Sequence, residues 1–364
     1  MFRNWLISAV AAFVMAAAPA HAAPAKTLKI VQLDMEGGGG TLYVTPEGVS
    51  VLVDMGSQAG AMWTTSLDGA KGPADRIVAA AKALGVRKLD YVIATHYHGD
   101  HIGSLAELLD LIPIGTFVDH GVNRELFNPA DDPKEPPRTQ AGYVKYLQLI
   151  KGHRRIIVKA GDVLHFSSLT DTVVAADGRP IARPLAGAGE PGQQCDLPPM
   201  KEDKGLENQK SIASVFSFGK VRIAAFGDLT WDREHDLVCP LDKVGHVNIM
   251  ILDNHGMGVS NHPGFVHTLA PDIAIMGNGS KKGDWPDVVK TVNSSPGLQG
   301  FWRAHASTVY PGQDGDPDFL ANLGPLPSHG YSIRLDVTRQ GAVTVTNARN
   351  GYTKTYQVKS VEPG

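Results

Sequence analysis

Residues 95–101 read THYHGDH, and this stretch decides the fold and the chemistry expected of the chain. It directly follows the run LDYVIA at 89–94, whose apolar character predicts a buried strand. Three imidazoles and one carboxylate therefore come together where a strand is expected to end and a helix to begin. Imidazole and carboxylate together form a borderline ligand set that suits zinc, and also manganese or iron.

The spacing within this stretch predicts that the side chains converge. His96 and His98 are two residues apart, so in extended chain they point to the same side. Gly99 allows the backbone to turn, and Asp100 and His101 then begin the following helix, aimed at a second point nearby. The sequence thus predicts a metal site at a strand-to-helix junction.

The stretch resembles the HxHxDH metal motif of the metallo-beta-lactamase fold hydrolases, and three other segments strengthen the likeness. Residues 51–56 (VLVDMG) resemble that fold's early strand ending in Asp-x-Gly. Residues 226–229 (FGDL) resemble its Gly-Asp motif, whose aspartate bridges two metals, and residues 254–256 (NHG) resemble the segment of its last metal histidine. The resemblance implies an α/β fold, a four-layer αββα sandwich, with residues 23–364 forming one domain.

The resemblance also implies a ligand set and a mechanism. Asp228 bridges two divalent ions, and its partners at the first ion are His96 and His98. Its partners at the second are Asp100, His101 and His255. Zinc is the first expectation for both ions, with manganese or iron as alternatives. A hydroxide held between the ions attacks an ester-type bond, and Asp100 briefly accepts its proton.

A narrower likeness is to the soluble domain of DNA-uptake competence proteins. Residues 34–42 (DMEGGGGTL), residues 208–218 and the following GDLT at 227–230 carry it, and it favours a phosphodiester or phosphate ester as substrate. One departure is Glu207-Asn208, which stand where the larger family has a Gly-His ligand, so the first metal has a more open site. Hydrolysis of a lactam, lactone or thioester, and a non-hydrolytic iron redox or binding role, remain alternatives.

Further polar residues are candidates without a motif of their own. His305 could protonate a leaving group, His120 could line the mouth of the site, and Asn208 could bind the substrate. For both histidines the alternative is a satisfied core or surface side chain. Asp54 is expected to accept a structural hydrogen bond rather than to bind metal.

The N-terminus predicts export. Residues 1–22 combine an early Arg3, a mostly apolar stretch and an Ala-His-Ala cleavage site, which together are typical of a secretory signal peptide. The expected location is periplasmic or secreted, with no membrane anchor after cleavage. In an oxidising compartment Cys195 and Cys239 could pair as a disulfide.

Charge limits the partners that we expect. The chain has 34 Lys+Arg against 37 Asp+Glu, a formal net charge of −3. No basic excess supports an extended nucleic-acid surface. A small molecule or a short oligonucleotide is the expected substrate.

Periodicity predicts alternating strands and helices along the chain. Residues 185–210 show no periodicity and predict a long loop, and residues 330–358 predict an antiparallel meander. Strands are expected at 27–34, 41–44, 50–54, 89–94, 114–118, 156–164, 172–176, 212–216, 221–226, 247–252 and 273–276, and helices at 74–84, 104–111, 141–150 and from 265.

Overall fold

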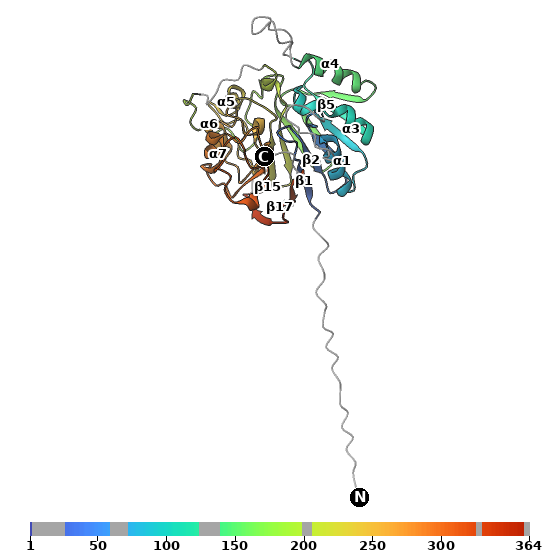
Figure 1. The fold of residues 1–364 in the computed structure, drawn as a ribbon. Coiled ribbons are helices and arrows are strands. Elements are labelled where there is room, and N and C mark those ends of the chain that lie inside the picture. The colour runs from blue at the N-terminus through green and yellow to red at the C-terminus, as the bar shows by residue number, and fades with distance from the viewer. Residues whose placement is uncertain (2–25, 59–71, 124–138, 199–205, 325–329, 360–364) are drawn as a thin grey trace.

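The computed structural model describes residues 1, 26–58, 72–123, 139–198, 206–324 and 330–359 (Figure 1). The predicted signal peptide, beyond Met1, lies outside these ranges, and so export stays a prediction. Among the described residues, no helix has the length and apolar character needed to cross a bilayer.

The first sheet contains both the first and the last strands of the described chain. Its order is β18-β17-β16-β1-β2-β3-β4-β5-β6. The N-terminal strand therefore lies inside the sheet, with Leu28 opposite Val337 of the antiparallel C-terminal meander. The strands are β1 (Leu28–Gln32), β2 (Thr41–Val44), β3 (Ser50–Val53), β4 (Leu89–Ile93), β5 (Ile114–Asp119), β6 (Arg154–Ile157), β16 (Ile333–Val337), β17 (Ala342–Asn347) and β18 (Thr353–Gln357).

The second sheet comes from the middle of the chain. Its order is β15-β14-β13-β12-β11-β10-β8-β7, with β9 paired to β8. From β11 to β15 neighbouring strands are parallel. The strands are β7 (Val163–Phe166), β8 (Leu169–Ala176), β9 (Arg179–Pro180), β10 (Ala213–Phe218), β11 (Val221–Ala225), β12 (Ile249–Ile251), β13 (Ile273–Met276), β14 (Gly300–His305) and β15 (Leu320–Asn322).

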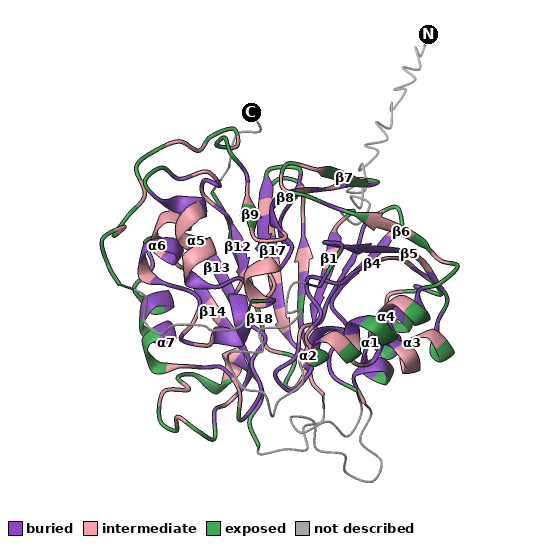
Figure 2. Cartoon of the chain, turned by 90° about the horizontal axis from the view of Figure 1, so that it is seen from above, coloured by how far each residue is buried: buried purple, intermediate pink, exposed green. Residues whose placement is uncertain are grey.

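Helices cover the outer faces of the two sheets, which pack against each other (Figures 1 and 2). The inner core between the sheets includes Tyr43, Phe216 and Trp302, each fully buried. The predicted four-layer αββα sandwich is confirmed. The first sheet carries α1 (Pro73–Ala83), α2 (Gly99–Ile102), α3 (Leu105–Leu111) and α4 (Gln140–Leu149), and the second carries α5 (Trp231–Val238), α6 (Pro263–Leu269) and α7 (Pro286–Asn293). Short 3-10 turns occur at η1 (Asn208–Lys210), η2 (Asp253–Gly256) and η3 (Pro317–Phe319).

Some predicted elements were wrong or missing. The single strand expected at 156–164 is two strands in different sheets, β6 and β7, because the chain turns between Lys159 and Asp162. Helices α5 and α7 were not predicted. Each has only eight residues, so a helical period has little length in which to show itself.

The edge at which parallel strands end positions the functional side chains. Strand β4 lies parallel to β3, and β11, β12 and β13 run parallel in the other sheet. The segments that follow these strands gather at the carboxyl ends, where irregular backbone can present polar groups.

Candidate metal centre

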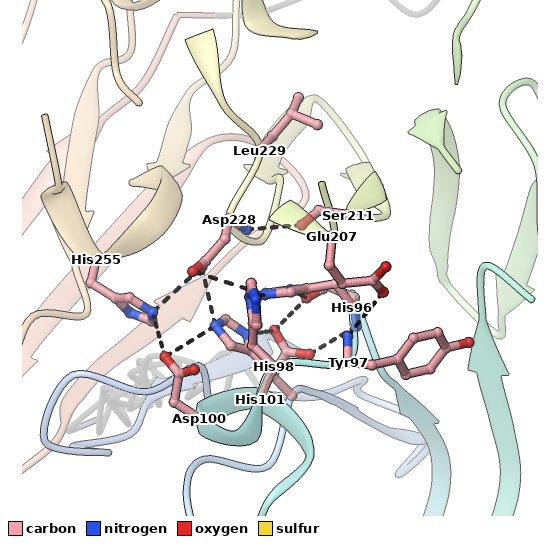
Figure 3. A network of polar contacts seen from close by, with 12 residues as sticks. His96, Tyr97, His98, Asp100, His101, Glu207, Ser211, Asp228, Leu229 and His255 are labelled. Atoms are coloured by element: carbon pink, nitrogen blue, oxygen red, sulfur yellow. Dashed lines mark hydrogen bonds and ion pairs between the residues drawn. The ribbon is translucent and has the colours of Figure 1, made fainter. Parts of the chain in front are cut away.

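A compact cluster of two imidazoles and two carboxylates lies at this edge. Asp100, His101, Asp228 and His255 offer ligand atoms that all lie within 4.8 Å of one another. Oδ1 of Asp228 is 3.1 Å from Nε2 of His101 and 3.4 Å from Nε2 of His255. Figure 3 shows the four side chains converging from segments that are far apart in the sequence.

The cluster has the properties of a cation site. Asp228 Oδ1, His101 Nε2 and His255 Nε2 are buried and lack a hydrogen-bond partner. Leaving such atoms unsatisfied costs about 1–3 kcal/mol each, and a shared cation would satisfy all three. Imidazole nitrogens with carboxylate oxygens fit a divalent metal ion.

A second pair of imidazoles borders the cluster. Nε2 of His96 lies 2.9 Å from Nδ1 of His98 and 4.0 Å from Oδ2 of Asp228. Burial, together with the neighbouring His101, holds the pKa of His96 well below its usual value, so that ring is neutral. The two histidines predicted for the first metal thus lie side by side, and Asp228 is the residue of the four-residue cluster that faces His96.

A buried carboxylate orients His101. Oδ2 of Asp54 lies 2.7 Å from Nδ1 of His101 and accepts a hydrogen bond from the hydroxyl of Thr95. Oδ1 of Asp54 accepts the backbone N–H of Thr95. This arrangement directs Nε2 of His101 at the cluster, and it is the structural role that the sequence predicts for Asp54.

Neighbouring charges keep the cluster carboxylates ionised. Burial raises the pKa of Asp228, but His101 and His255 outweigh it and hold that pKa well below its usual value. Burial likewise opposes ionisation of Asp100, but Lys282 and His101 lower its pKa well below the usual range. For His101, burial is outweighed by Asp228, Asp54 and Asp100, and its pKa lies well above the usual value.

The backbone around His255 is unusual. Asn254 and His255 follow β12 with φ of 46° and 56°, in the left-handed region that residues other than glycine seldom adopt. The N–H of Asn254 donates to the carbonyl of Gly227, directly before Asp228. The turn that carries one cluster histidine is thereby tied to the turn that carries the shared carboxylate, and such local strain is typical of functional sites.

A cavity of about 580 Å³ opens beside the cluster. This volume is in the range of small-molecule sites. Its lining combines polar groups near the cluster with apolar groups from α4, and consists of Ser57, Gln58, His98, Gly99, Asp100, Ile102, Gly103, Gly142, Lys145, Tyr146, Leu149, Asn208, Asp228, Asn254 and Lys282.

The other sequence-predicted residues divide in two. Asn208 lines the cavity, as a substrate-binding residue must. His305 does not line it: the side chain is fully buried and its Nε2 lies 2.7 Å from Oδ1 of Asp34. His120 is also outside the lining, with Nε2 2.9 Å from Oε1 of Glu207.

We therefore correct the two histidine predictions. His305 is not placed to protonate a leaving group and His120 is not placed at the mouth, because a buried carboxylate engages each ring. Glu207 also accepts a hydrogen bond from the backbone N–H of Tyr97, within the stretch THYHGDH. It therefore stabilises that stretch and does not line the cavity.

The two cysteines form a disulfide. Cys195 lies in the loop 185–210, and Cys239 directly follows α5. The bond links the described first part of this loop, residues 185–198, to the end of α5 on the second sheet.

Comparison with known proteins identifies the fold. The metallo-beta-lactamase superfamily model matches residues 37–187, a stretch that includes the whole of THYHGDH. This chain has the metallo-beta-lactamase fold. The matched stretch ends before Asp228 and His255, so the contribution of these two residues to the cluster rests on the geometry of this chain alone. A comparison with curated proteins finds no match.

Solved structures of low sequence identity resemble the chain. They include the metallo-beta-lactamase fold protein YhfI from Bacillus subtilis, with 14% identity over 77% of this chain and 96% of that chain and a TM-score of 0.43. A diphosphatase from the PhnP family has 11% identity over 86% of this chain and 98% of that chain, with a TM-score of 0.41. CmlA, a diiron beta-hydroxylase from Streptomyces venezuelae, has 12% identity over 77% of this chain, which spans 53% of CmlA, with a TM-score of 0.41. No activity is transferred from matches this distant.

Sequence reasoning assigned no partner to Lys282, which lines the cavity. Lys282 follows β13 in the segment GNGSKKGDW and reaches the carboxylate of Asp100, with which it forms an ion pair. The glycines of that segment, directly after an apolar strand, were the available signal of a functional loop.

Proposed function

We propose that the protein is an exported metal-dependent hydrolase that uses two divalent ions, zinc first among them, to cleave a small phosphate ester or phosphodiester. The observation that carries the proposal is the position of Asp228. Its Oδ1 faces His101 and His255, and its Oδ2 faces His96. One carboxylate with its two oxygens toward two imidazole groups is what a bridging ligand requires.

The residues divide the work between holding the ions and receiving substrate. His96, His98 and Asp228 would hold one ion, and Asp228 with Asp100, His101 and His255 would hold the other. Bound divalent ions make water a nucleophile near neutral pH and offset charge on a phosphoryl oxygen.

Asp100 and Asn208 face the reaction space. The Asp100 side chain is 16% exposed, whereas that of Asp228 is only 5% exposed. Both carboxylates line the cavity, and Asp100, as the more exposed of the two, is the better placed to accept the proton of the attacking water. Asn208 supplies an amide that can bind a substrate oxygen.

Two features favour phosphate chemistry over the alternatives. The likeness of segments 34–42, 208–218 and 227–230 to the competence proteins points to phosphodiesters. Glu207-Asn208 in place of a Gly-His ligand argues against a beta-lactamase. The cavity of about 580 Å³ and the acidic net charge suit a small or short substrate rather than long nucleic acid.

A substrate panel tests this function. Protein spanning residues 23–364, loaded with zinc or manganese, is assayed with bis-p-nitrophenyl phosphate, p-nitrophenyl phosphate, nitrocefin, a lactone and a thioester. We expect the phosphate esters to be cleaved fastest and two ions to be bound per chain. Preferred cleavage of the lactone or thioester would replace phosphate with the alternative substrate class. Iron without hydrolysis would indicate redox chemistry.

Export is a part of the proposal with its own test. The disulfide is the bond expected of an oxidising compartment, and residues 1–22 have the pattern of a leader. Expression in a bacterium followed by N-terminal sequencing of the periplasmic fraction should give a chain that starts at Ala23. Recovery of only the uncleaved chain in the cytoplasm would contradict export.

A further inference from the structure

Lys282 joins the two sheets across the metal cluster. It comes from the segment after β13, and its ammonium contacts the carboxylate of Asp100 at the start of α2, on the opposite sheet. Both side chains are 16% exposed, and both line the cavity. The pair therefore lies at the boundary between the buried cluster and the space open to a ligand.

Close packing fixes the position of this lysine. A Cβ at Gly37 would lie 3.0 Å from Cβ and 3.2 Å from Cδ of Lys282, so the lysine stem packs on bare backbone. Gly283 has φ of +82°, and a Cβ there would lie 1.9 Å from the carbonyl oxygen of His255. The turn that carries Lys282 thus packs against the backbone of His255. This packing restricts the position of the Lys282 ammonium.

The charges around Lys282 favour an anionic ligand. Asp54, Asp100 and Asp228 together carry three formal negative charges, which one divalent ion and the ammonium of Lys282 balance. With neutral imidazoles, a second divalent ion then makes the site positive. A metal ion that coordinates Asp100 competes with Lys282 for that carboxylate. The ammonium of Lys282 can then donate a hydrogen bond to another anion beside the ion.

The part of the cavity lining that comes from α4 has different chemistry. Gly142, Tyr146 and Leu149 of α4, with Ile102 of α2, supply apolar surface, and Lys145 of α4 adds one exposed cation. A ligand that fills this volume therefore has a charged end at the cluster and an apolar end against α4.

We propose that Lys282 is a substrate-binding residue that donates to an anionic oxygen of the substrate, and that the substrate is a small phosphate monoester or diester with an aryl or alkyl group against α4. The proposal deepens the proposed function and rests on it for the substrate class. It gives Lys282 two successive partners: Asp100 in the metal-free protein and the phosphoryl group in the loaded one.

Phosphate binding tests the role of Lys282 without catalysis. Binding of inorganic phosphate to the zinc-loaded protein is measured by calorimetry for the wild type, Lys282→Met, Lys282→Arg and Lys281→Met. Lys281 is an exposed neighbour outside the cavity lining and serves as the matched control. We expect Lys282→Met to weaken phosphate binding about tenfold, as loss of a charge-assisted hydrogen bond should, with partial rescue by arginine and no change for Lys281→Met.

Zinc binding to the metal-free variants shows whether Lys282 binds phosphate or only stabilises the metal cluster. Lys282 and the metal compete for Asp100, so Lys282→Met should bind zinc as tightly as the wild type or several-fold more tightly. Unchanged phosphate affinity in Lys282→Met would overturn the proposal. A loss of zinc together with phosphate would also overturn it, because the lysine would then only hold the cluster together.

Kinetics distinguish this proposal from the proposed function. Lys282→Met should raise KM for bis-p-nitrophenyl phosphate about tenfold with a smaller change in kcat. Cleavage of the ester with an unchanged KM would reject the role of Lys282 and keep the hydrolase. Phosphate binding that depends on Lys282, without cleavage of any phosphate ester, would reject the hydrolase and keep the anion site. In the wild type, phenyl phosphate should have a lower KM than methyl phosphate, and equal values would reject the apolar contact with α4.

Discussion

The two halves of the metal centre differ in how completely they are built. Asp100, His101, Asp228 and His255 bring four ligand atoms within 4.8 Å of one another. Beside them, His96 and His98 contact each other at 2.9 Å, and His96 is 4.0 Å from the shared Asp228. One half has a full set for an ion, whereas the other has two imidazoles and a distant carboxylate.

The difference lies in the segment before β10. In the four-residue half, the segments after β4, β11 and β12 each contribute at least one ligand. In the other, the segment before β10 contributes Glu207, which turns back to His120, and Asn208, which lines the cavity. The expected outcome is an unequal pair of sites, one tight and one weak, with an open coordination position toward substrate.

The largest effect should come from the residue that both halves share. Asp228→Asn keeps the shape but removes the charge, so kcat/KM should fall about a thousandfold and both ions should bind more weakly. Activity assays with metal analysis measure this. Asp232→Asn, an exposed carboxylate on α5, is the control and should change neither. Retention of two tightly bound ions in Asp228→Asn would show that the halves are independent.

A smaller effect confined to the four-residue half should come from Asp54→Asn. Asp54 orients His101 at 2.7 Å, and loss of such a partner typically weakens metal binding about 10–100-fold. Competition with a chelator should show the tight step weakening while the weak step stays in place. Equal weakening of both steps would mean that Asp54 supports the whole turn 95–101 rather than one ligand.

The difference between the two halves should become smaller when a ligand is added to the half that contains His96 and His98. Asn208→His adds a third imidazole next to His98 in the cavity lining, and the weak ion should bind about tenfold more tightly. Titration with zinc, followed by calorimetry, would show the two affinities approaching each other. Asn208→Gln, which adds length but no imidazole, should leave both affinities as they are.

A buried carboxylate outside both halves should affect neither. Asp171 on β8 has one hydroxyl partner, Ser214, and burial raises its pKa to about 7. Because its unfolded pKa is about 3.9, the folded state holds the extra proton between those values, and stability falls as pH rises from about 4 to about 7. Asp171→Asn should remove about 2 kcal/mol of this loss, seen by urea unfolding at pH 5 and 8.

Metal affinity gives the control for that variant. Asp171→Asn should bind zinc as the wild type does. This result would show that a buried carboxylate away from the imidazoles affects stability without affecting metal binding. A pH dependence of stability that is the same in both proteins would contradict the raised pKa.

Much of the metal centre could be predicted because its first ligands are contiguous. Strand geometry alone places His96 and His98 on one side, and the structure keeps them there. Asp228 and His255 could not be reached from spacing, since they follow other strands more than a hundred residues later; only the family resemblance pointed to them.

The failures have a common physical cause. The sequence around a single histidine does not show which side chain that histidine contacts in the folded protein. His305 and His120 are as suited to proton transfer as to a buried contact with a carboxylate, and only the folded chain brings Asp34 to one and Glu207 to the other. The same holds for Lys281 and Lys282, adjacent and identical in type, of which one lines the cavity and the other is exposed.

The central position of β1 in its sheet has a consequence for how the protein is made. Leu28, near the start of the described chain, can pair with Val337 only after the residues up to 337 have been made. Contacts between such distant residues form slowly because a very large loop must close first. The first sheet is therefore complete only after β16 to β18 have been synthesised. A chain that stopped before residue 333 would leave β1 unpaired along the edge that faces β16.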